Sequence, residues 1–254
     1  MSGRGPRVGV VTFPGSLDDR DALRAVALMG GEPVAVWHAD PDLRGADAVI
    51  LPGGFSYGDY LRAGAIARFA PVMEAVAAFA RDGGPVLGIC NGFQVLCEAG
   101  LLPGALIRNR GLAFVCRWVH LRVEPRPRAG RASGGPTDGE PSGDLAIGAP
   151  GEVLQVPIKH GEGQFVCSDE DLAAIEANGQ VALRYCSPDG VVDERFNPNG
   201  ALDNIAGLFN EAGNVLGLMP HPEHAVDPDL GPTGGQAVLR WLFDAARARA
   251  RVAG

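Results

Sequence analysis

Cys90 stands where an apolar stretch of the chain gives way to a helix-like one. The segment from Gly84 to Gly100 reads GPVLGICNGFQVLCEAG, with Gly88 and Gly92 two positions to either side of the cysteine. Gly-x-Cys-x-Gly is the cysteine counterpart of the nucleophile elbow, a sharp strand–turn–helix that strains the residue at its apex. The N-terminus of the following helix favours a thiolate and offers amide donors to an oxyanion. The pattern predicts a nucleophilic thiol; the alternative is that Cys90 is a small buried hydrophobic residue.

A thiol nucleophile needs a base, and the base needs a group that orients it. Of the five histidines, only His221 stands beside a carboxylate in a suggestive frame, LMPHPEH, where Pro222 separates it from Glu223. The strand before this segment is expected to end at the same sheet edge as Cys90. Glu223 would then accept from one ring nitrogen of His221 and leave the other to take the thiol proton. The alternative is a surface turn of polar residues.

The other histidines and cysteines are interpreted mostly as structural. His38, His120 and His224 are expected at strand ends or on the surface. His160, in IKHGEG, stands in a Gly-flanked turn that could reach the site, although nothing in the sequence requires it. The remaining cysteines lack the elbow and are interpreted as small hydrophobic residues: Cys97, Cys116, Cys167 and Cys186.

Strands alternate with helices in the first half of the chain. Near-continuous apolar segments at 7–13, 33–38, 46–54 and 85–90 predict buried strands. Residues 18–30 predict an amphipathic helix, and residues 58–84 predict two helices divided at Pro71. Apolar strands separated by helices are typical of an α/β fold, a doubly wound, mostly parallel sheet with helices on both faces. Such sheets bind ligands at the carboxyl edge of their strands, where Cys90 is expected.

The second half of the chain is less regular. Strand-like segments at 114–125 and 152–165 flank residues 126–144, which are rich in Gly, Pro and Ser and predict a flexible loop. Residues 205–219 predict a β-hairpin. A last helix is expected from Gly235 to Val252, with its apolar residues facing inward and its arginines outward: Val238, Leu239, Leu242 and Phe243 against Arg240, Arg247, Arg249 and Arg251.

Composition narrows the class of protein. The 254 residues, 46% hydrophobic, are interpreted as a single domain spanning 1–254. A net charge of −8 argues against a nucleic-acid binder, which needs clustered Lys and Arg. Five scattered cysteines without a C-x-x-C pair predict reduced thiols in the cytoplasm rather than a disulfide framework or a metal site. The start of the chain has no signal-peptide pattern, and its apolar run is too short to cross a membrane.

Several segments together resemble one family. They are PGGFSYGDYLRAGAIARFA, VLGICNGFQVLCEAGLLPGAL, HGEGQF, NPNG followed by NIAG, and VLGLMPHPEH. The chain resembles, nearly end to end, the glutaminase subunits of phosphoribosylformylglycinamidine synthase, which are class I (triad-type) glutamine amidotransferases of flavodoxin-like fold. The resemblance implies that Cys90 attacks the side-chain amide of L-glutamine, with His221 as base and Glu223 as its orienter. It also implies an oxyanion site at the backbone of Gly53 or Gly54 and of Asn91, and glutamine binding that includes Gln94.

The same resemblance implies partners. The ammonia would pass to a large ATP-dependent synthetase subunit that converts formylglycinamide ribonucleotide to the amidine in purine biosynthesis, and a small accessory subunit is expected as well. ATP and magnesium would belong to the synthetase, because this chain has no P-loop, and no cofactor is expected here. The segment GGFSYGDYLRAGAIARF is the expected contact surface, since its aromatic and Arg residues are types favoured in interfaces: Phe55, Tyr57, Tyr60 and Arg62.

The sequence departs from the family pattern at three places. The first turn reads PGSLDD, where an Asn-containing version is common, and Ser16–Asp19 receive no role. HPEH ends in His224, where Arg is frequent, and this change is expected to leave the chemistry unaffected. The 126–144 segment is longer than expected. Two alternatives stay open: another class I amidotransferase or γ-glutamyl hydrolase, and a redox-sensing elbow-cysteine protein without catalysis, against which the His-Pro-Glu segment counts.

Overall fold

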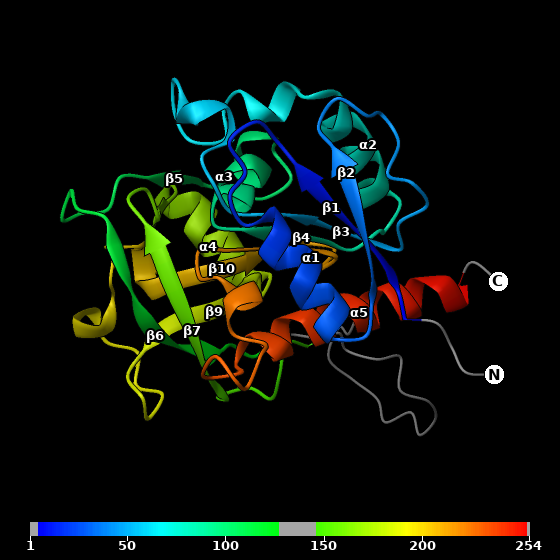
Figure 1. Cartoon of the computed structure of the whole chain (residues 1–254). Coiled ribbons are helices and arrows are strands. Elements are labelled where there is room, and N and C mark those ends of the chain that lie inside the picture. The colour runs from blue at the N-terminus through cyan, green and yellow to red at the C-terminus, as the bar shows by residue number, and fades with distance from the viewer. Residues whose placement is uncertain (1–4, 127–145, 253–254) are drawn as a thin grey trace.

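A nine-stranded sheet runs through the computed structural model, which describes residues 5–126 and 146–252 (Figure 1). Its strands lie in this order across the sheet: β2 (Glu32–Trp37), β1 (Arg7–Thr12), β3 (Ala48–Leu51), β4 (Val86–Ile89), β11 (Val215–Leu218), β10 (Ile205–Phe209), β9 (Val181–Cys186), β6 (Val115–Val123) and β7 (Val153–His160). A second, two-stranded sheet pairs β5 (Ala105–Ile107) with β8 (Gln164–Val166).

The first five strands in that order, β2 to β11, are all parallel. Their arrangement is the flavodoxin-like one, in which the chain reverses direction across the sheet after its first strand. The other four strands join by antiparallel pairing, beginning with the predicted hairpin of β10 and β11. The doubly wound, mostly parallel fold class is confirmed, and the irregular second half of the chain extends the same sheet.

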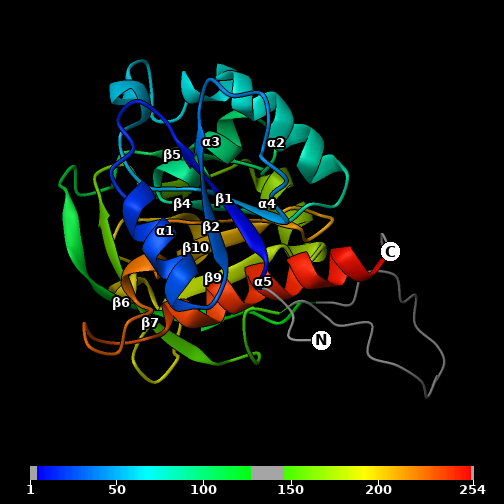
Figure 2. The same cartoon turned by 45° about the vertical axis from the view of Figure 1, so that its right-hand side comes forward.

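Helices cover both faces of the parallel part. Helices α1 (Asp19–Leu28) and α5 (Gly235–Val252) lie on one face, and α2 (Pro71–Arg81) and α3 (Asn91–Glu98) on the other (Figures 1 and 2). The helix α4 (Asp169–Ala177) belongs to the second half. Because both faces are covered, β3 and β4 are buried along their whole length, which explains their unbroken apolar sequence. The predicted inward face of α5 is also buried.

One predicted helix is wrong. Residues 58–70 form no α-helix; two short 3₁₀ turns, η1 (Ser56–Asp59) and η2 (Ala67–Phe69), precede α2 instead. Gly58 and Gly64 adopt φ angles of +74° and +81°, in the left-handed region that interrupts a right-handed helix. At Gly64 a side chain would also collide with α3, because a Cβ atom there would lie 2.7 Å from the Val95 nitrogen. The segment therefore packs closely over α3 as an irregular loop.

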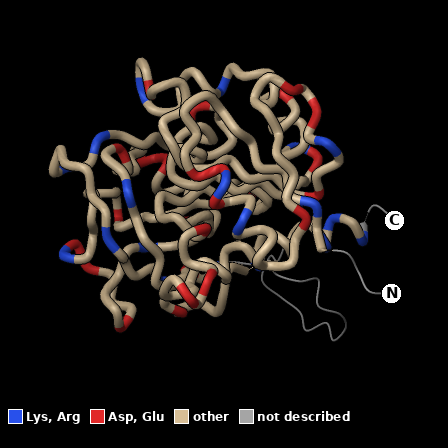
Figure 3. The backbone as a smooth tube through the Cα atoms, viewed as in Figure 1, with Lys and Arg blue, Asp and Glu red and all other residues tan. Residues whose placement is uncertain are grey.

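Two further sequence expectations concern the 126–144 segment and the charge of the chain. The predicted 126–144 loop lies, apart from Arg126, outside the described residues. Lys and Arg are interspersed with Asp and Glu over the described chain (Figure 3), and the expectation against nucleic acid stays a prediction. Among the helices of the described residues, none is both long and apolar enough to span a bilayer.

Candidate active site

Cys90 occupies the apex of a strained turn between β4 and α3. Its backbone adopts φ +51° and ψ −104°, a conformation that a residue with a side chain rarely takes. The Cys90 N–H donates to the carbonyl of Leu218, 2.8 Å away, at the end of the neighbouring strand β11. Because β4 and β11 are parallel, with Ile89 opposite Leu218, both strands deliver their next residues to one edge of the sheet. The elbow predicted from the sequence is confirmed.

The glycines on either side of Cys90 make the turn possible. A Cβ atom on Gly92 would lie 1.9 Å from the carbonyl oxygen of Leu51, and one on Gly88 would lie 2.8 Å from the backbone of Gly92. Helix α3 therefore lies closer to the end of β3 at Gly92, and β4 lies closer to the start of α3 at Gly88, than a side chain at either position would allow.

Gly92→Ala is expected to destabilise the fold by about 2–3 kcal/mol or more, because the added methyl group meets backbone that cannot move aside. Urea unfolding of the variant against the unmodified chain measures this. Gly111→Ala is the matched control, since Gly111 has open space around it and an ordinary φ angle, and it should change the unfolding free energy by less than about 0.5 kcal/mol. Equal stability of the two variants would contradict the crowding at the elbow.

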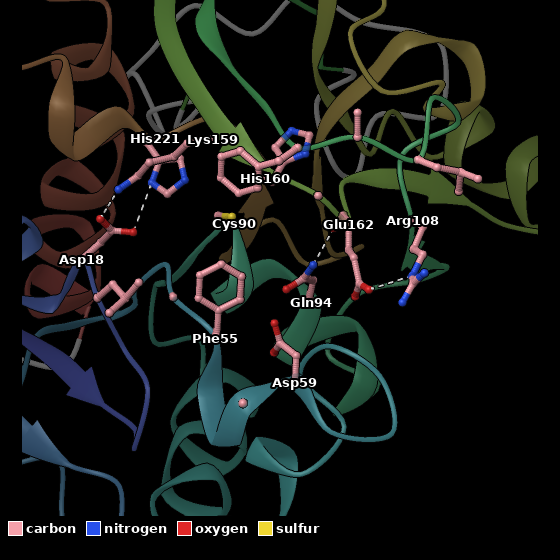
Figure 4. Close-up of a pocket in the computed structure, with 17 residues that line it drawn as sticks. Asp18, Phe55, Asp59, Cys90, Gln94, Arg108, Lys159, His160, Glu162 and His221 are labelled. Atoms are coloured by element: carbon pink, nitrogen blue, oxygen red, sulfur yellow. Dashed lines mark hydrogen bonds and ion pairs between the residues drawn. The ribbon is translucent and has the colours of Figure 1, made fainter.

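His221 follows β11 and is held on both sides. Its N–H donates to the carbonyl of Pro157 at 2.8 Å, and its ring Nδ1 lies 2.6 Å from Glu223 Oε1 in the turn η5 (Pro222–His224). Both side chains are about 1% exposed. The other ring nitrogen, Nε2, is buried without an oxygen or nitrogen partner among the described residues, and Cys90 lies beside it in the cavity (Figure 4). The nucleophile, base and orienter named from the sequence are brought together.

The charge state of His221 follows from these neighbours. Burial alone would lower the pKa of the imidazole. The carboxylate of Glu223 and the sulfur of Cys90 outweigh burial and raise the pKa of His221 to about 10. The ring therefore holds a second proton readily, as a base paired with a thiolate must.

The turn at Gly53 and Gly54 closes the other side of Cys90. This turn pairs with residues 15–17 through two backbone hydrogen bonds. The Leu17 N–H donates to the Gly53 carbonyl, and the Phe55 N–H donates to the Gly15 carbonyl. The N–H of Gly54 takes no part in this pairing. The N–H of Asn91 belongs to the first turn of α3, where amides have no acceptor within the helix. The structure thus sets the predicted oxyanion residues on two elements that flank the elbow.

Asn91 and Gln94 tie these elements together through their side chains. Asn91 Oδ1 accepts from the Ser56 N–H at 3.1 Å, and its Nδ2 donates to Gln94 Oε1 at 2.8 Å. Gln94 in turn donates to the carbonyl of Glu162. Gln94 lines the cavity, as the sequence-based assignment requires. Both the oxygen and the nitrogen of its side-chain amide already form hydrogen bonds within the protein.

The cavity in front of Cys90 has a volume of about 530 Å³ and carries charges of both signs. Asp59 and Glu162 stand on one side, and Arg108 lies 3.5 Å from Glu162 (Figure 4). Burial, with a contribution from the charge of Glu162, raises the pKa of Asp59 to about 6, although a hydrogen bond from Asn91 opposes the rise. Lys159 contributes a second cation to the wall.

His160, left open by the sequence, lines the same cavity and is buried. Its Nδ1 lies 3.1 Å from Asn109 Oδ1, which also accepts from the Gly163 N–H, so this ring nitrogen is the donor. Burial, together with the positive charge of His221, lowers the pKa of His160 to about 4. The ring is therefore neutral, and its Nε2 is an acceptor with no partner among the described residues.

Asp18 and Lys159 are site residues that the sequence did not reveal. Asp18 is 3% exposed and forms an ion pair with Lys159, and its Oδ1 lies 3.2 Å from His224 Nε2. Burial would raise the pKa of Asp18, but the hydrogen bond from His224 and the charges of His221 and Lys159 lower it well below its ordinary value. The surface interpretation of His224 missed this contact, because its ring is 30% exposed but faces the Asp18 carboxylate.

The four groups Asp18, His221, Glu223 and His224 place ligand atoms within 4.8 Å of one another, a spacing that a metal ion could use. Their atoms are already engaged with one another, and the ammonium of Lys159 occupies Asp18. The positive charge of Lys159 balances the charge of Asp18, and His221 is paired with Glu223. These groups therefore form an ion-pair cluster rather than a metal site.

Comparisons with known proteins agree with this geometry. Residues 5–237 match the family described as the CobB/CobQ-like glutamine amidotransferase domain. The chain is 57% identical over 241 residues to phosphoribosylformylglycinamidine synthase subunit PurQ of Rubrobacter xylanophilus, covering 95% of this chain and 99% of the relative. It is 51% identical over 247 residues to the PurQ of Gloeobacter violaceus, with the same coverage of each.

A solved structure agrees as well. A chain of the structure of PurLQS from Thermotoga maritima superposes with a TM-score of 0.75 at 40% identity, covering 94% of this chain and 98% of that one. Identity and coverage of this extent exceed what a shared fold alone would produce. The chain belongs to the PurQ family, the phosphoribosylformylglycinamidine synthase subunits among the CobB/CobQ-like glutamine amidotransferases.

Proposed function

We propose that this chain, acting as a single glutamine amidotransferase domain, is the cytoplasmic glutaminase subunit of phosphoribosylformylglycinamidine synthase and that Cys90, His221 and Glu223 are its catalytic triad. The observation that carries the proposal is the position of Cys90 on a strained elbow beside the buried His221–Glu223 pair, inside a charged cavity. Membership in the PurQ family supplies the reaction.

In the first half of the reaction, His221 takes the thiol proton and the sulfur of Cys90 attacks the side-chain carbonyl carbon of L-glutamine. The amides of Gly53 or Gly54 and of Asn91 hold the oxyanion that forms. The imidazolium of His221 then gives its proton to the departing nitrogen. The carbon–nitrogen bond breaks, ammonia leaves, and a γ-glutamyl thioester remains on Cys90.

In the second half, water replaces ammonia beside the same imidazole. His221 takes a proton from the water as its oxygen attacks the thioester carbon, and the second oxyanion uses the same amides. Collapse of this intermediate breaks the carbon–sulfur bond and releases glutamate, and the proton on His221 is available again to the sulfur of Cys90. Glu223 keeps its hydrogen bond to Nδ1 throughout and offsets the positive charge each time the ring is protonated.

The charged groups of the cavity suit free glutamine, which carries an ammonium and a carboxylate on its α-carbon. Asp59 and Glu162 offer negative charge and Arg108 offers positive charge, while the ammonium of Lys159 is paired with Asp18. A γ-glutamyl peptide carries the same ammonium and carboxylate on its α-carbon and differs from glutamine only at its leaving amine. Turnover of free glutamine against γ-glutamyl peptides therefore separates the proposed function from that of a γ-glutamyl hydrolase.

The partner that receives ammonia is the large ATP-dependent synthetase subunit, and a small accessory subunit completes the assembly. ATP and magnesium are used on the synthetase. The contact surface is the segment 53–69 near the mouth of the cavity, where Phe55 and Tyr60 are exposed, Tyr60 at 73%. Two exposed residues that the sequence did not indicate, Leu112 and Phe114, line the cavity on its other side and extend this surface. Tyr57 is held inside by its bond to His38.

Binding of the synthetase is expected to raise glutamine turnover at least about tenfold, because ammonia released by an isolated chain is wasted and the partner shifts the site toward its competent arrangement. Turnover is measured for the chain alone, with the synthetase, and with the synthetase plus its substrates. Equal rates in the three assays would contradict the coupling.

The same assay tests the contact surface. Tyr60→Ala should weaken association with the synthetase while leaving the unfolding of the isolated chain unchanged, because this side chain is exposed. Leu230→Ala, at a similarly exposed apolar residue in the loop before α5, is the matched control. Normal binding by Tyr60→Ala would place the interface elsewhere.

A further inference from the structure

Two departures from the family pattern, distant in the sequence, meet beside the catalytic histidine. The turn PGSLDD contributes Asp18, and the segment HPEH contributes His224. Asp18 Oδ1 and His224 Nε2 are 3.2 Å apart across 206 positions of the chain. The ammonium of Lys159, at the end of β7, contacts the same carboxylate. Three elements therefore converge on one buried side chain.

The carboxylate of Asp18 is free to do this because it does not cap its own helix. Asp18 is the N-cap of α1, a position where an Asp side chain ordinarily accepts from the first-turn amides. The side chain of Asp18 makes no such bond, whereas Ser168, the N-cap of α4, accepts from the Asp171 N–H at 3.1 Å. The Asp18 side chain turns instead toward the active site, as Figure 4 shows.

Its second oxygen faces the catalytic ring. Asp18 Oδ2 lies 3.6 Å from His221 Nδ1, on the side of the ring that already binds Glu223. Gly53 permits this approach, because a Cβ atom there would lie 2.4 Å from Asp18 Oδ2 and 2.7 Å from His221 Cε1. The backbone N–H of Asp18 also donates to the Gly53 carbonyl at 3.2 Å. One residue thus touches both the base and the turn that carries the oxyanion donors.

We infer that Asp18, held in place by Lys159 and His224, is a positioning residue for His221: a second carboxylate that fixes the ring and favours its protonated form during glutamine hydrolysis. This inference rests on the proposed roles of Cys90 and His221. It gives a role to the contact between Asp18 and His224, which lies next to the triad. It also reverses the expectation that His224 leaves the chemistry unaffected.

The sign of the effect follows from the charges around the ring. The titratable groups that face or adjoin His221 are Cys90, Glu223, Asp18, His224, His160 and, through Asp18, Lys159. Asp18 stabilises the imidazolium, so removing its charge must make the ring lose its proton at lower pH. The positive charge of Lys159 disfavours the protonated form of His221 and partly neutralises Asp18. Removing that charge must therefore make the ring lose its proton at higher pH. A general loss of structure would not produce shifts of opposite sign.

The test is the titration of His221 by NMR in the full chain labelled with ¹⁵N-histidine, together with glutamine turnover in complex with the synthetase. In Asp18→Asn the titration midpoint should fall by about one pH unit. kcat should fall about tenfold, with KM changed less than about twofold, because the residue acts on the base rather than on glutamine. In Lys159→Met the midpoint should rise. Asp21→Asn, a carboxylate in the same first turn of α1, is the matched control and should leave the midpoint in place.

An unchanged midpoint in Asp18→Asn, or a fall of equal size in Lys159→Met, would overturn the inference. If Asp18→Asn does not fold, the direction of the shift in Lys159→Met decides. Failure of the proposed function is distinguishable, because it would appear as full glutamine turnover in a chain without the Cys90 thiol, while the NMR midpoint reports on Asp18 independently of turnover.

Discussion

Cys90→Ser is expected to abolish glutamine-dependent synthesis by the complex of this chain with its synthetase, while synthesis from added ammonium salt continues. A serine hydroxyl fits the elbow but is a far weaker nucleophile than a thiolate, and the residue acts as a unit with His221, so the loss should be about 1,000-fold or more. Ammonium-dependent synthesis survives because the synthetase carries its own site. Product formation with glutamine and with ammonium salt, measured side by side, checks both halves.

Cys116→Ser is the control for this prediction. Cys116 is an exposed thiol on β6, away from the elbow, and its replacement should leave both activities intact. Full glutaminase activity in Cys90→Ser would contradict the assignment of Cys90 as the nucleophile. Loss of the ammonium-dependent activity as well would mean that the variant had damaged the assembly rather than the chemistry.

The parts of the site that were predictable from the sequence are those set by local pattern. The glycines around Cys90 fix a turn within a few residues of chain, and the apolar strands before Cys90 and before His221 fix the edge at which both emerge. Glu223 is two residues from His221, so one short turn is enough to pair them. Each of these relations depends on sequence neighbours or on the parallel pairing that buried strands require.

The parts that were missed depend on contacts between distant segments. Asp18 meets Lys159 across 141 positions, and neither residue stands in a local pattern that marks it as part of a site. The sequence did show two departures from the family pattern. They are recognised as one contact, between Asp18 and His224, only when the fold places them side by side. The error at 58–70 has the same origin. Helical composition there is overridden by left-handed glycines and by packing against α3.

The redox-sensing alternative fares poorly against the geometry. Cys90 stands beside the buried and oriented His221–Glu223 pair, an arrangement that proton transfer during catalysis requires and a sensing thiol does not. Membership in the PurQ family points the same way.

His221→Ala is expected to lower glutamine turnover by about 1,000-fold or more, because no other base within residues 5–126 and 146–252 is paired with Cys90 to take the thiol proton and return it to the leaving nitrogen. The nearest substitute, His160, is neutral and bonded to Asn109. Alkylation of Cys90 by iodoacetamide should slow in the same variant, because the thiolate loses its partner. Turnover in complex with the synthetase and the alkylation rate of the chain alone are the two measurements.

Glu223→Gln tests how stability and glutamine turnover depend on pH. Glu223 helps to raise the pKa of His221 to about 10, above its ordinary value of 6.5, so the folded site keeps a proton that the unfolded chain has lost. The stability that this proton provides is complete below about pH 6.5 and disappears as the pH rises through about 10. Turnover should fall over the same alkaline range, because the ring can no longer protonate the leaving nitrogen. Removing the charge of Glu223 should move that fall to lower pH, with a smaller loss of rate at neutral pH than His221→Ala causes.

His120→Ala is the control for the base, since His120 lies on β6 outside the cavity lining and should leave both the rate and its pH profile unchanged. His160→Ala separates the two histidines that line the cavity. A neutral ring that binds or shapes the site affects mainly KM, whereas loss of the base affects kcat. If His221→Ala preserved turnover while His160→Ala destroyed it, the base would be His160, and the buried pair of His221 and Glu223 would be a structural feature of the sheet edge.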